Sequence, residues 1–163
     1  MIGKVIKYNL KNINTDLIIP ARYLINSDSN FLAQHCMEDL DRDFVDKVKK
    51  EDYKIMVADS NFGCGSSREQ APLALKASGI KCIIAPSFAR IFFRNSINIG
   101  LQIVELSNID DIKTGDVLEI DLKSGEINNL TSKHHYTVKK QPGFLQEVIS
   151  DGGLVNYAKK RLI

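Results

Sequence analysis

The sequence predicts an α/β domain in which a parallel βαβ core is extended by antiparallel strands into a mixed sheet. Between residues 51 and 106, short apolar runs alternate with stretches of helical spacing, which is typical of parallel βαβ units. Residues 107–163 change to alternating strands and turns, followed by two helical stretches. The length of 163 residues, 44% of them hydrophobic, suits a single domain spanning residues 1–163 with a real core.

The first 50 residues predict a strand, a loop and a helical region. Residues 4–8 alternate polar and apolar side chains, like a half-buried strand. The apolar run at residues 17–19 ends at Pro20, which has no backbone N–H to donate to a sheet. Helical spacing follows over residues 31–49, and we expect it to break near residues 39–41.

The middle of the chain predicts the βαβ core. Strands are expected at residues 54–58, 81–85 and 101–106. A helix is expected over residues 68–78, because Gly79 follows it as a glycine commonly follows a helix end. A second helix is expected to begin at Pro86 and Ser87 and to run to about Ile97.

The last third of the chain predicts the antiparallel extension. Residues 117–122 alternate as a strand, residues 123–126 form a turn, and residues 135–139 suit another strand. Helices are expected at residues 143–150 and 154–162, on either side of an Asp-Gly-Gly sequence.

Charge and hydropathy argue against two classes of partner. The net charge is only +2, whereas nucleic-acid binders gather a strong basic excess on one face. The basic cluster Lys159, Lys160 and Arg161 is interpreted as a solvated helix end. No apolar stretch reaches the ~20 residues needed to span a bilayer. Residues 1–10 lack the apolar block of a secretory signal, so we expect a cytoplasmic protein.

The cysteines and histidines do not predict a metal centre within this chain. Cys36, Cys64 and Cys82 are odd in number and widely spaced, which argues against a disulfide framework and against a metal site built by this chain alone. Cys36 and Cys82 are expected to pack as small apolar side chains. His134 and His135 are adjacent and would point to opposite faces of a strand, so no metal role is expected for them.

The most informative segment is residues 59–69, called the anion loop below, which joins a predicted buried strand to a predicted helix. The first N–H groups of a helix are free and attract anions. Gly63 and Gly65 allow the backbone to turn sharply and to approach a ligand closely. Ser66 and Ser67 add hydroxyls, and Arg68 adds a guanidinium that fits a carboxylate with two hydrogen bonds. This pattern predicts a site for a small carboxylate or a phosphate.

Three common loop motifs do not fit this segment. It lacks the Gly-Lys-Ser/Thr ending of a Walker loop, and Arg68 stands where a dinucleotide-binding fingerprint needs its third glycine. Neither serine has glycine two residues before and two residues after it, as a nucleophile elbow requires. A plainer alternative is that Ser66 or Ser67 caps the helix with support from Glu69. The local pattern leaves the cap and the ligand site equally open.

Four segments together resemble a known family. The residues 61–72, from Asn-Phe-Gly-Cys-Gly-Ser-Ser-Arg-Glu to Gln-Ala-Pro, closely resemble the signature of the small subunits of 3-isopropylmalate dehydratase and archaeal-type homoaconitase, an element also found in the swivelling domain of aconitase. The resemblance continues through residues 14–24, 86–95 and 115–116. Gln70 departs from it, because many relatives have His there. The resemblance implies a swivelling β/β/α domain of the aconitase type.

The resemblance also implies a hydro-lyase reaction and a partner. The expected activity is the isomerisation of 2-isopropylmalate and 3-isopropylmalate by dehydration and rehydration, in leucine biosynthesis. A [4Fe-4S] cluster would be carried by a large partner subunit, in a heterodimer or heterotetramer, and none would be bound by this chain. The alternatives are a sister hydro-lyase acting on homocitrate, citraconate or a methylated malate such as 2,3-dimethylmalate, and a stand-alone anion-binding module.

By the same resemblance, the anion loop would contain the catalytic residues. Ser66 would act as the base that removes a carbon-bound proton, as an alkoxide. Arg68 and Ser67 would hold a substrate carboxylate, with Gly65 allowing its close approach. Thr15 and Asp16 would lie close to the site, with Asp16 orienting a neighbouring group. The local pattern equally allows Asp16 to be a loop N-cap or an Asx turn.

Ile25 is the expected determinant of substrate choice. In the resembling family the stretch around residues 22–26 forms a loop over the variable group of the substrate. Homoaconitase-like members tend to carry Arg directly after the Tyr-Leu pair, whereas this chain has Ile25 after Tyr23 and Leu24. An isoleucine favours an isopropyl group over a further carboxylate, because burying an unpaired carboxylate beside it is costly. The alternative is that Ile25 packs in the core or in a subunit interface.

Overall fold

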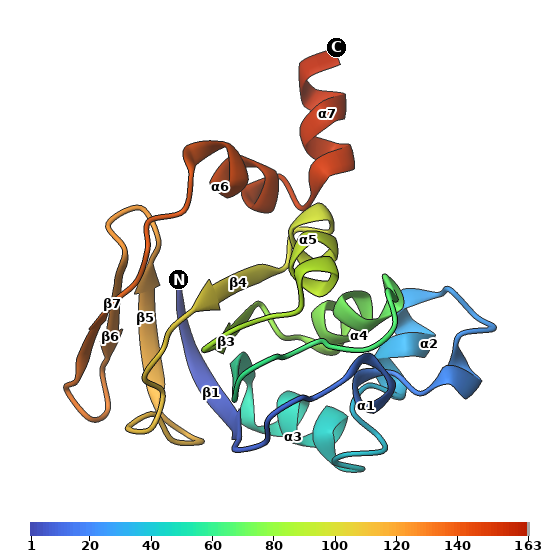
Figure 1. Ribbon diagram of the computed structural model, residues 1–163, viewed down its shortest axis with the longest axis horizontal. Coiled ribbons are helices and arrows are strands. Elements are labelled where there is room, and N and C mark those ends of the chain that lie inside the picture. The colour runs from blue at the N-terminus through green and yellow to red at the C-terminus, as the bar shows by residue number, and fades with distance from the viewer. Residues whose placement is uncertain (163) are drawn as a thin grey trace.

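The computed structural model describes residues 1–162 and contains a seven-stranded mixed sheet in the order β4-β3-β2-β1-β5-β6-β7 (Figure 1). The strands are β1 (Ile2–Tyr8), β2 (Tyr53–Ala58), β3 (Cys82–Ala85), β4 (Gln102–Glu105), β5 (Val117–Asp121), β6 (Glu126–Asn129) and β7 (His135–Thr137). β1 to β4 run parallel, whereas β5, β6 and β7 are joined to β1 by antiparallel pairs. The predicted mixed sheet is therefore confirmed.

Helices cover the parallel half of the sheet and extend beyond it. They are α1 (Thr15–Ile18), the 3₁₀ turn η1 (Ala21–Tyr23), α2 (Ser29–Gln34), α3 (Phe44–Glu51), α4 (Gln70–Ser78), α5 (Arg90–Asn98), α6 (Gly143–Ser150) and α7 (Leu154–Leu162). Within residues 1–162, none of these helices is long and apolar enough to cross a membrane.

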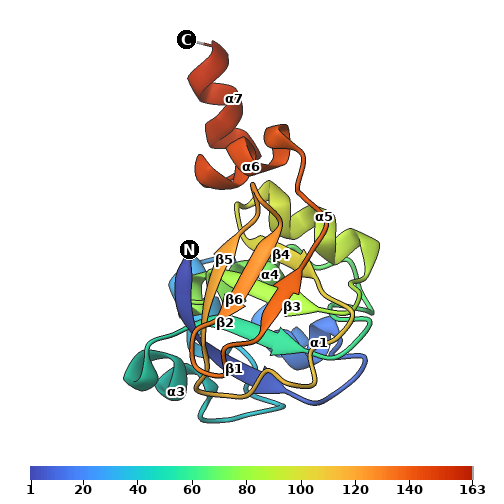
Figure 2. The ribbon, with the colours of Figure 1, turned by 90° about the vertical axis from the view of Figure 1, so that its left-hand side faces the viewer.

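The sheet curls, so that its two faces are buried in two different ways (Figure 2). One apolar cluster fills the space between the parallel strands and the helices, and it includes Met56, Ile83 and Leu75. The other cluster joins residues of the parallel strands, such as Val57, to residues of the antiparallel strands, such as Ile120. Both faces of β2 and β3 are thus largely dry, which explains why the sequences of these two strands are nearly continuous apolar runs.

Several predicted boundaries hold and four are wrong. Gly79 has a φ of +118° and ends α4, as predicted. However, α4 begins at Gln70 and not at residue 68. The region 31–49 contains two helices, because the break extends over residues 35–43 rather than 39–41 alone. The strand β6 already begins at Glu126, which was assigned to the preceding turn.

The fourth error concerns the start of α5, which is Arg90 and not Pro86. Residues 86–89 are extended, because they pair with the anion loop. The Phe62 N–H donates to the Ser87 carbonyl at 3.1 Å, and the Ala89 N–H donates to the Phe62 carbonyl at 2.9 Å. This tertiary pairing outweighs the local preference of Pro86 for the first turn of a helix.

Candidate active site

Three segments that are far apart in the sequence meet at the carboxyl end of β2. The anion loop lies between the segments 12–15 and 86–89, joined by isolated parallel bridges between Asn14 and Cys64 and between Phe62 and Phe88. The Gly63 N–H donates to the Ile13 carbonyl at 2.8 Å. All three segments belong to the family-like motifs, so the fold brings those motifs into one site.

The first half of the anion loop is fixed by aromatic packing. Phe62 is fully buried and meets the rings of Phe88 and Phe92 edge to face, at centroid distances of 6.1 and 5.3 Å. Gly63 has a φ of +76°, and a β-carbon there would overlap the ring of Phe92. Glycine is therefore required at residue 63 by both its backbone conformation and the available space.

The second half of the anion loop offers free hydrogen-bond donors. Gly65, Ser66 and Ser67 are exposed, and within residues 1–162 their backbone N–H groups have no acceptor. Gly65 has a φ of +93°, in the left-handed region that favours glycine. Successive N–H groups in such a turn make a concave site for an anion. Neither serine caps α4, because Glu69 is the N-cap residue and no side chain caps the helix, so the capping interpretation is wrong.

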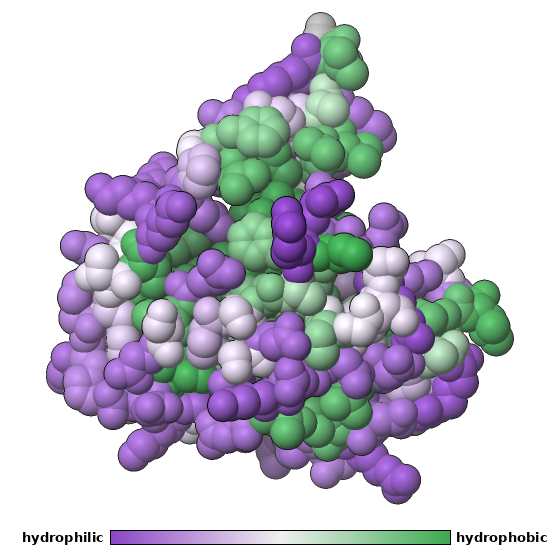
Figure 3. All heavy atoms as spheres, in the orientation of Figure 1, coloured by the Kyte–Doolittle hydropathy of each residue, from purple (hydrophilic) through white to green (hydrophobic). Residues whose placement is uncertain are grey.

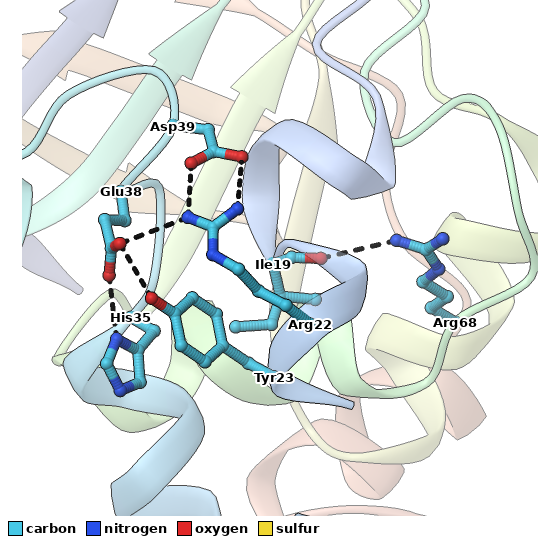
Figure 4. A network of polar contacts seen from close by, with 7 residues as sticks. All are labelled: Ile19, Arg22, Tyr23, His35, Glu38, Asp39 and Arg68. Atoms are coloured by element: carbon cyan, nitrogen blue, oxygen red, sulfur yellow. Dashed lines mark hydrogen bonds and ion pairs between the residues drawn. The ribbon is translucent and has the colours of Figure 1, made fainter. Parts of the chain in front are cut away.

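Arg68 lies at the edge of this exposed loop with most of its side chain covered. Its Nη1 donates to a carboxylate oxygen of Asp16 at 2.6 Å. The same Nη1 also donates to the Ile19 carbonyl at 3.4 Å (Figure 4). The N-cap of α1 is Asn14, whose side chain accepts from the Leu17 N–H at 2.9 Å. Asp16 is therefore not the N-cap of α1, and its carboxylate pairs with the guanidinium of Arg68 instead.

Thr15 lies beneath the anion loop. Its side chain is only 1% exposed, and its N–H donates to the Cys64 carbonyl at 2.9 Å. Its hydroxyl is the nearest atom to the place where a β-carbon of Gly65 would lie, at 3.4 Å, and has no hydrogen-bond partner within the described residues. Thr15 thus supports the backbone of the loop from below.

The residue expected to choose the substrate projects into solvent. Ile25 is 93% exposed, so the alternative that it packs in the core of this chain is wrong. It lies in the segment 20–28, called the Tyr23 turn below. Arg68 donates a hydrogen bond to the carbonyl of Ile19, the residue that precedes this turn. The helix α2, which follows the turn, packs against α4. The turn is thereby tied at one end to the anion loop and at the other end to α4.

Side chains hold the Tyr23 turn in place (Figure 4). The Tyr23 hydroxyl donates to Glu38 at 2.8 Å, and its ring stacks on His35 with centroids 3.7 Å apart. His35 also contacts the second oxygen of Glu38 at 2.7 Å. Arg22 forms a two-pronged pair with Asp39, at 2.5 and 3.0 Å. The hydrogen bond from His35, followed by that from Tyr23, lowers the pKa of the Glu38 carboxyl.

This network was missed in the sequence. A possible signal is the spacing of three between His35 and Glu38, which suits neighbours on a helix, but these residues lie in the break between α2 and α3. Their pairing with Arg22 and Tyr23 depends on the tertiary path of the chain, which no local pattern reveals.

The cysteines behave as structural residues apart from Cys64. Cys36 and Cys82 are buried, as predicted, and burial raises the pKa of both thiols, that of Cys82 to about 12. Cys64 is half-buried in the anion loop. Within residues 1–162, no group of three or more His, Cys, Asp or Glu side chains is arranged to hold a metal ion.

Comparison with known families agrees with the fold and the motifs. The family model of the aconitase C-terminal domain matches residues 3–109. A crystal structure of 3-isopropylmalate dehydratase from Methanocaldococcus jannaschii has a TM-score of 0.90 and 47% sequence identity, and the match covers 99% of this chain and 96% of that one. The curled α/β fold is therefore that of the aconitase C-terminal domain.

The curated relatives are more specific. The 3-isopropylmalate dehydratase small subunit of Caldanaerobacter subterraneus subsp. tengcongensis is 55% identical over 163 residues, with 99% of both chains covered. That of Thermodesulfovibrio yellowstonii is 57% identical over 161 residues, with 98% of this chain and 94% of the relative covered. The chain belongs to the family of 3-isopropylmalate dehydratase small subunits, within the aconitase C-terminal domains.

Proposed function

We propose that this chain is the small subunit of a hydro-lyase that interconverts 2-isopropylmalate and 3-isopropylmalate, and that it works with a large subunit. The observation that supports this most directly is the exposed anion loop. It combines the free N–H groups of Gly65, Ser66 and Ser67 with two free hydroxyls and the Arg68 guanidinium. A dicarboxylate substrate needs such donors, and charge-assisted hydrogen bonds to a carboxylate are strong.

Ser66 is proposed as the group that moves the proton. As an alkoxide it takes a proton from the carbon next to the hydroxyl-bearing carbon. A carbon–carbon double bond forms as hydroxide leaves. Water then adds in the opposite orientation. Its hydroxyl goes to the carbon that lost the proton, and Ser66 returns the proton to the carbon that lost the hydroxyl. The overall reaction is therefore an isomerisation. A serine alkoxide needs stabilisation, which free N–H groups in a water-excluded site supply.

Arg68 and Ser67 are proposed to bind the substrate carboxylate. The guanidinium of Arg68 has donors left after its bond to Asp16, because arginine carries five N–H groups. Asp16 orients it, and Thr15 supports the loop that holds the serines. The covered position of Arg68 strengthens its interaction with a carboxylate, since local screening by water is reduced.

The [4Fe-4S] cluster implied by the aconitase relationship does not fit this chain. Such a cluster needs cysteine thiolates, but Cys36 and Cys82 are buried with raised thiol pKa values. Only Cys64 lies in the anion loop, and a single thiol cannot hold the cluster. We therefore assign the cluster to the large subunit, where it would act as a Lewis acid on the leaving hydroxide.

The chemistry of Ile25 favours isopropylmalate over substrates with a third carboxylate. Its exposed side chain could lose water against an isopropyl group, at about 0.8 kcal/mol for each buried CH₂ group.

We propose that residues 1–163 form one domain that acts in the cytoplasm, because its free cysteines are usual in reducing compartments.

The test is co-expression of this chain with its large subunit and an anaerobic assay on a panel of malate derivatives. We expect turnover of 2- and 3-isopropylmalate and little turnover of homoaconitate or citraconate. The chain purified alone should show no turnover and no bound iron. Stoichiometric iron in the isolated chain, or a preference for another substrate, would contradict the proposal.

A further inference from the structure

The last helix exposes apolar side chains that nothing in residues 1–162 covers. α7 has no buried residue and extends away from the rest of the molecule (Figure 1). Val155 is 66% exposed and Leu162 is 85% exposed. A contiguous exposed apolar surface indicates an interaction site.

α7 is nevertheless held in a defined direction at its base. The turn between α6 and α7 packs closely on the end of α5, since a β-carbon on Gly100 would lie 2.5 Å from the carbonyl carbon of Gly152. The ammonium group of Lys76 donates to the Ile99 carbonyl in the same place. α7 is therefore presented to solvent at a fixed angle, which lowers the entropic cost of binding a partner.

A groove with a volume of about 550 Å³ lies between α5 on one side and α6 and α7 on the other. Its apolar wall includes Phe93, Ile97, Phe144, Leu145 and Leu154. Figure 3 shows hydrophobic side chains gathered over α6 and the base of α7, with hydrophilic residues around them. An apolar centre with a polar rim is the usual form of a protein–protein interface.

The charges in this groove indicate what its occupant must offer. Arg90 and Arg94 line it one helical turn apart on α5, and both are exposed. Glu105 also lines it. None of the three forms an ion pair within residues 1–162, so the groove has an excess positive charge. The best occupant therefore combines apolar side chains with carboxylates.

The groove borders the segment that pairs with the anion loop. Phe88 lines the groove and also forms the bridge with Phe62 in the anion loop. We propose that the large subunit docks in this groove, inserting an apolar segment that bears carboxylates. The inference rests on the proposed function, since a partner that supplies the cluster must come within contact distance of Ser66. A second copy of this chain is the competing occupant.

The test is the affinity of purified variants for the large subunit, measured by anaerobic calorimetry. Leu154→Glu and Arg94→Glu should each raise Kd at least about ten-fold, as changes at the centre of an interface do. The matched controls are Leu130→Glu and Lys133→Glu, at the end of the antiparallel strands away from α6 and α7 (Figure 1). Leu130 is 39% exposed, close to the 42% of Leu154, and both controls should bind like the unmodified chain.

An unchanged Kd for both groove variants would overturn the docking proposal while leaving the proposed function intact. So would a Leu154→Glu variant that changes only the self-association of the isolated chain, because the groove would then join two copies. If Leu154→Glu does not fold, Arg94→Glu decides the question, since its side chain is exposed and unpaired. Failure of the unmodified chain to bind the large subunit would instead contradict the proposed function.

Discussion

In the anion loop the backbone is held and the hydroxyls of two serines are free, whereas the Tyr23 turn is held by its side chains. Residues 62–64 bond to their neighbours through main-chain N–H and C=O groups, and the hydroxyls of Ser66 and Ser67 have no partner within residues 1–162. The Tyr23 turn is instead fastened by Arg22 and Tyr23 to the residues of the break between α2 and α3.

This difference has a functional meaning. A loop that performs chemistry must leave its reactive side chains unpaired, so its position must come from backbone bonds and packed aromatic rings. A turn that only presents a side chain can use its own polar groups as anchors and leave one residue, Ile25, at the tip. Changes in the anion loop should therefore alter turnover and substrate binding. Changes in the Tyr23 turn should instead alter substrate preference or the free energy of unfolding.

The largest expected effect is that of Ser66→Ala on turnover. Removal of a general base lowers kcat by about 10²–10⁴-fold. The free energy of unfolding should change by less than about 0.5 kcal/mol, because Ser66 is exposed and caps no helix. Steady-state kinetics of the assembled enzyme and urea unfolding of the chain measure the two quantities.

Ser60→Ala is the control for the Ser66 variant, since Ser60 lies in the same loop before the aromatic cluster. It should leave kcat within about two-fold of normal. Near-normal kcat in Ser66→Ala would show that another group removes the proton.

Arg68→Lys should act mainly on substrate binding. Lysine keeps the charge but loses the planar pair of donors, so KM should rise about 10- to 100-fold, as expected for charge-assisted hydrogen bonds worth about 1.5–3 kcal/mol. Asp16→Asn is a graded comparison, because it keeps the guanidinium and removes its partner at 2.6 Å. A smaller rise in KM for Asp16→Asn would support the orienting role of Asp16. An equal KM in the unmodified enzyme and in both variants would exclude carboxylate binding by Arg68 as well as its orientation by Asp16.

Ile25→Arg tests the tip of the Tyr23 turn. We expect kcat/KM for isopropylmalate to fall and that for homoaconitate to rise, each by about ten-fold, because the new cation can pair with a third carboxylate. Stability should stay nearly normal, since Ile25 is 93% exposed. Ile91→Arg, at an exposed apolar residue of α5, is the control and should keep the original preference. An unchanged preference in Ile25→Arg would show that this residue does not select the substrate.

Glu38→Gln should have the smallest effect, and that effect should depend on pH. The pKa of Glu38 is lowered in the folded chain from an ordinary value of 4.5, so its contribution to stability is present above about pH 4.5 and is lost as pH falls through the folded pKa. At pH 7 the variant should lose about 1 kcal/mol or less, as partly exposed ion pairs do.

Urea unfolding at pH 7 and at about pH 3 measures this difference, which should shrink at the lower pH because a larger share of Glu38 is then protonated. Glu126→Gln, at an exposed residue of β6 without an ion pair in the described chain, is the control. A loss that is the same at both pH values would mean that the carboxylate charge does not anchor the turn.

Much of the fold follows from local patterns. Nearly continuous apolar runs identify β2 and β3, because both faces of these strands are buried. Gly79 identifies the end of α4, because only glycine adopts its φ of +118° readily. The predicted end of α5 lies within one residue of Asn98, but its predicted start is wrong by four residues. The reason is that residues 86–89 pair with Phe62, and this tertiary pairing outweighs their local helix preference.

The sequence by itself determined the chemistry of the site. Glycines, two serines and an arginine in one short loop predict an anion site because each has a fixed donor or conformational property. Only the tertiary structure decided how that loop is held, that Asp16 faces Arg68, that Thr15 is buried beneath Gly65, and that Glu38 anchors Tyr23. These contacts join residues 15 to 52 positions apart, and such pairs are chosen by the packing of the whole chain rather than by local preference.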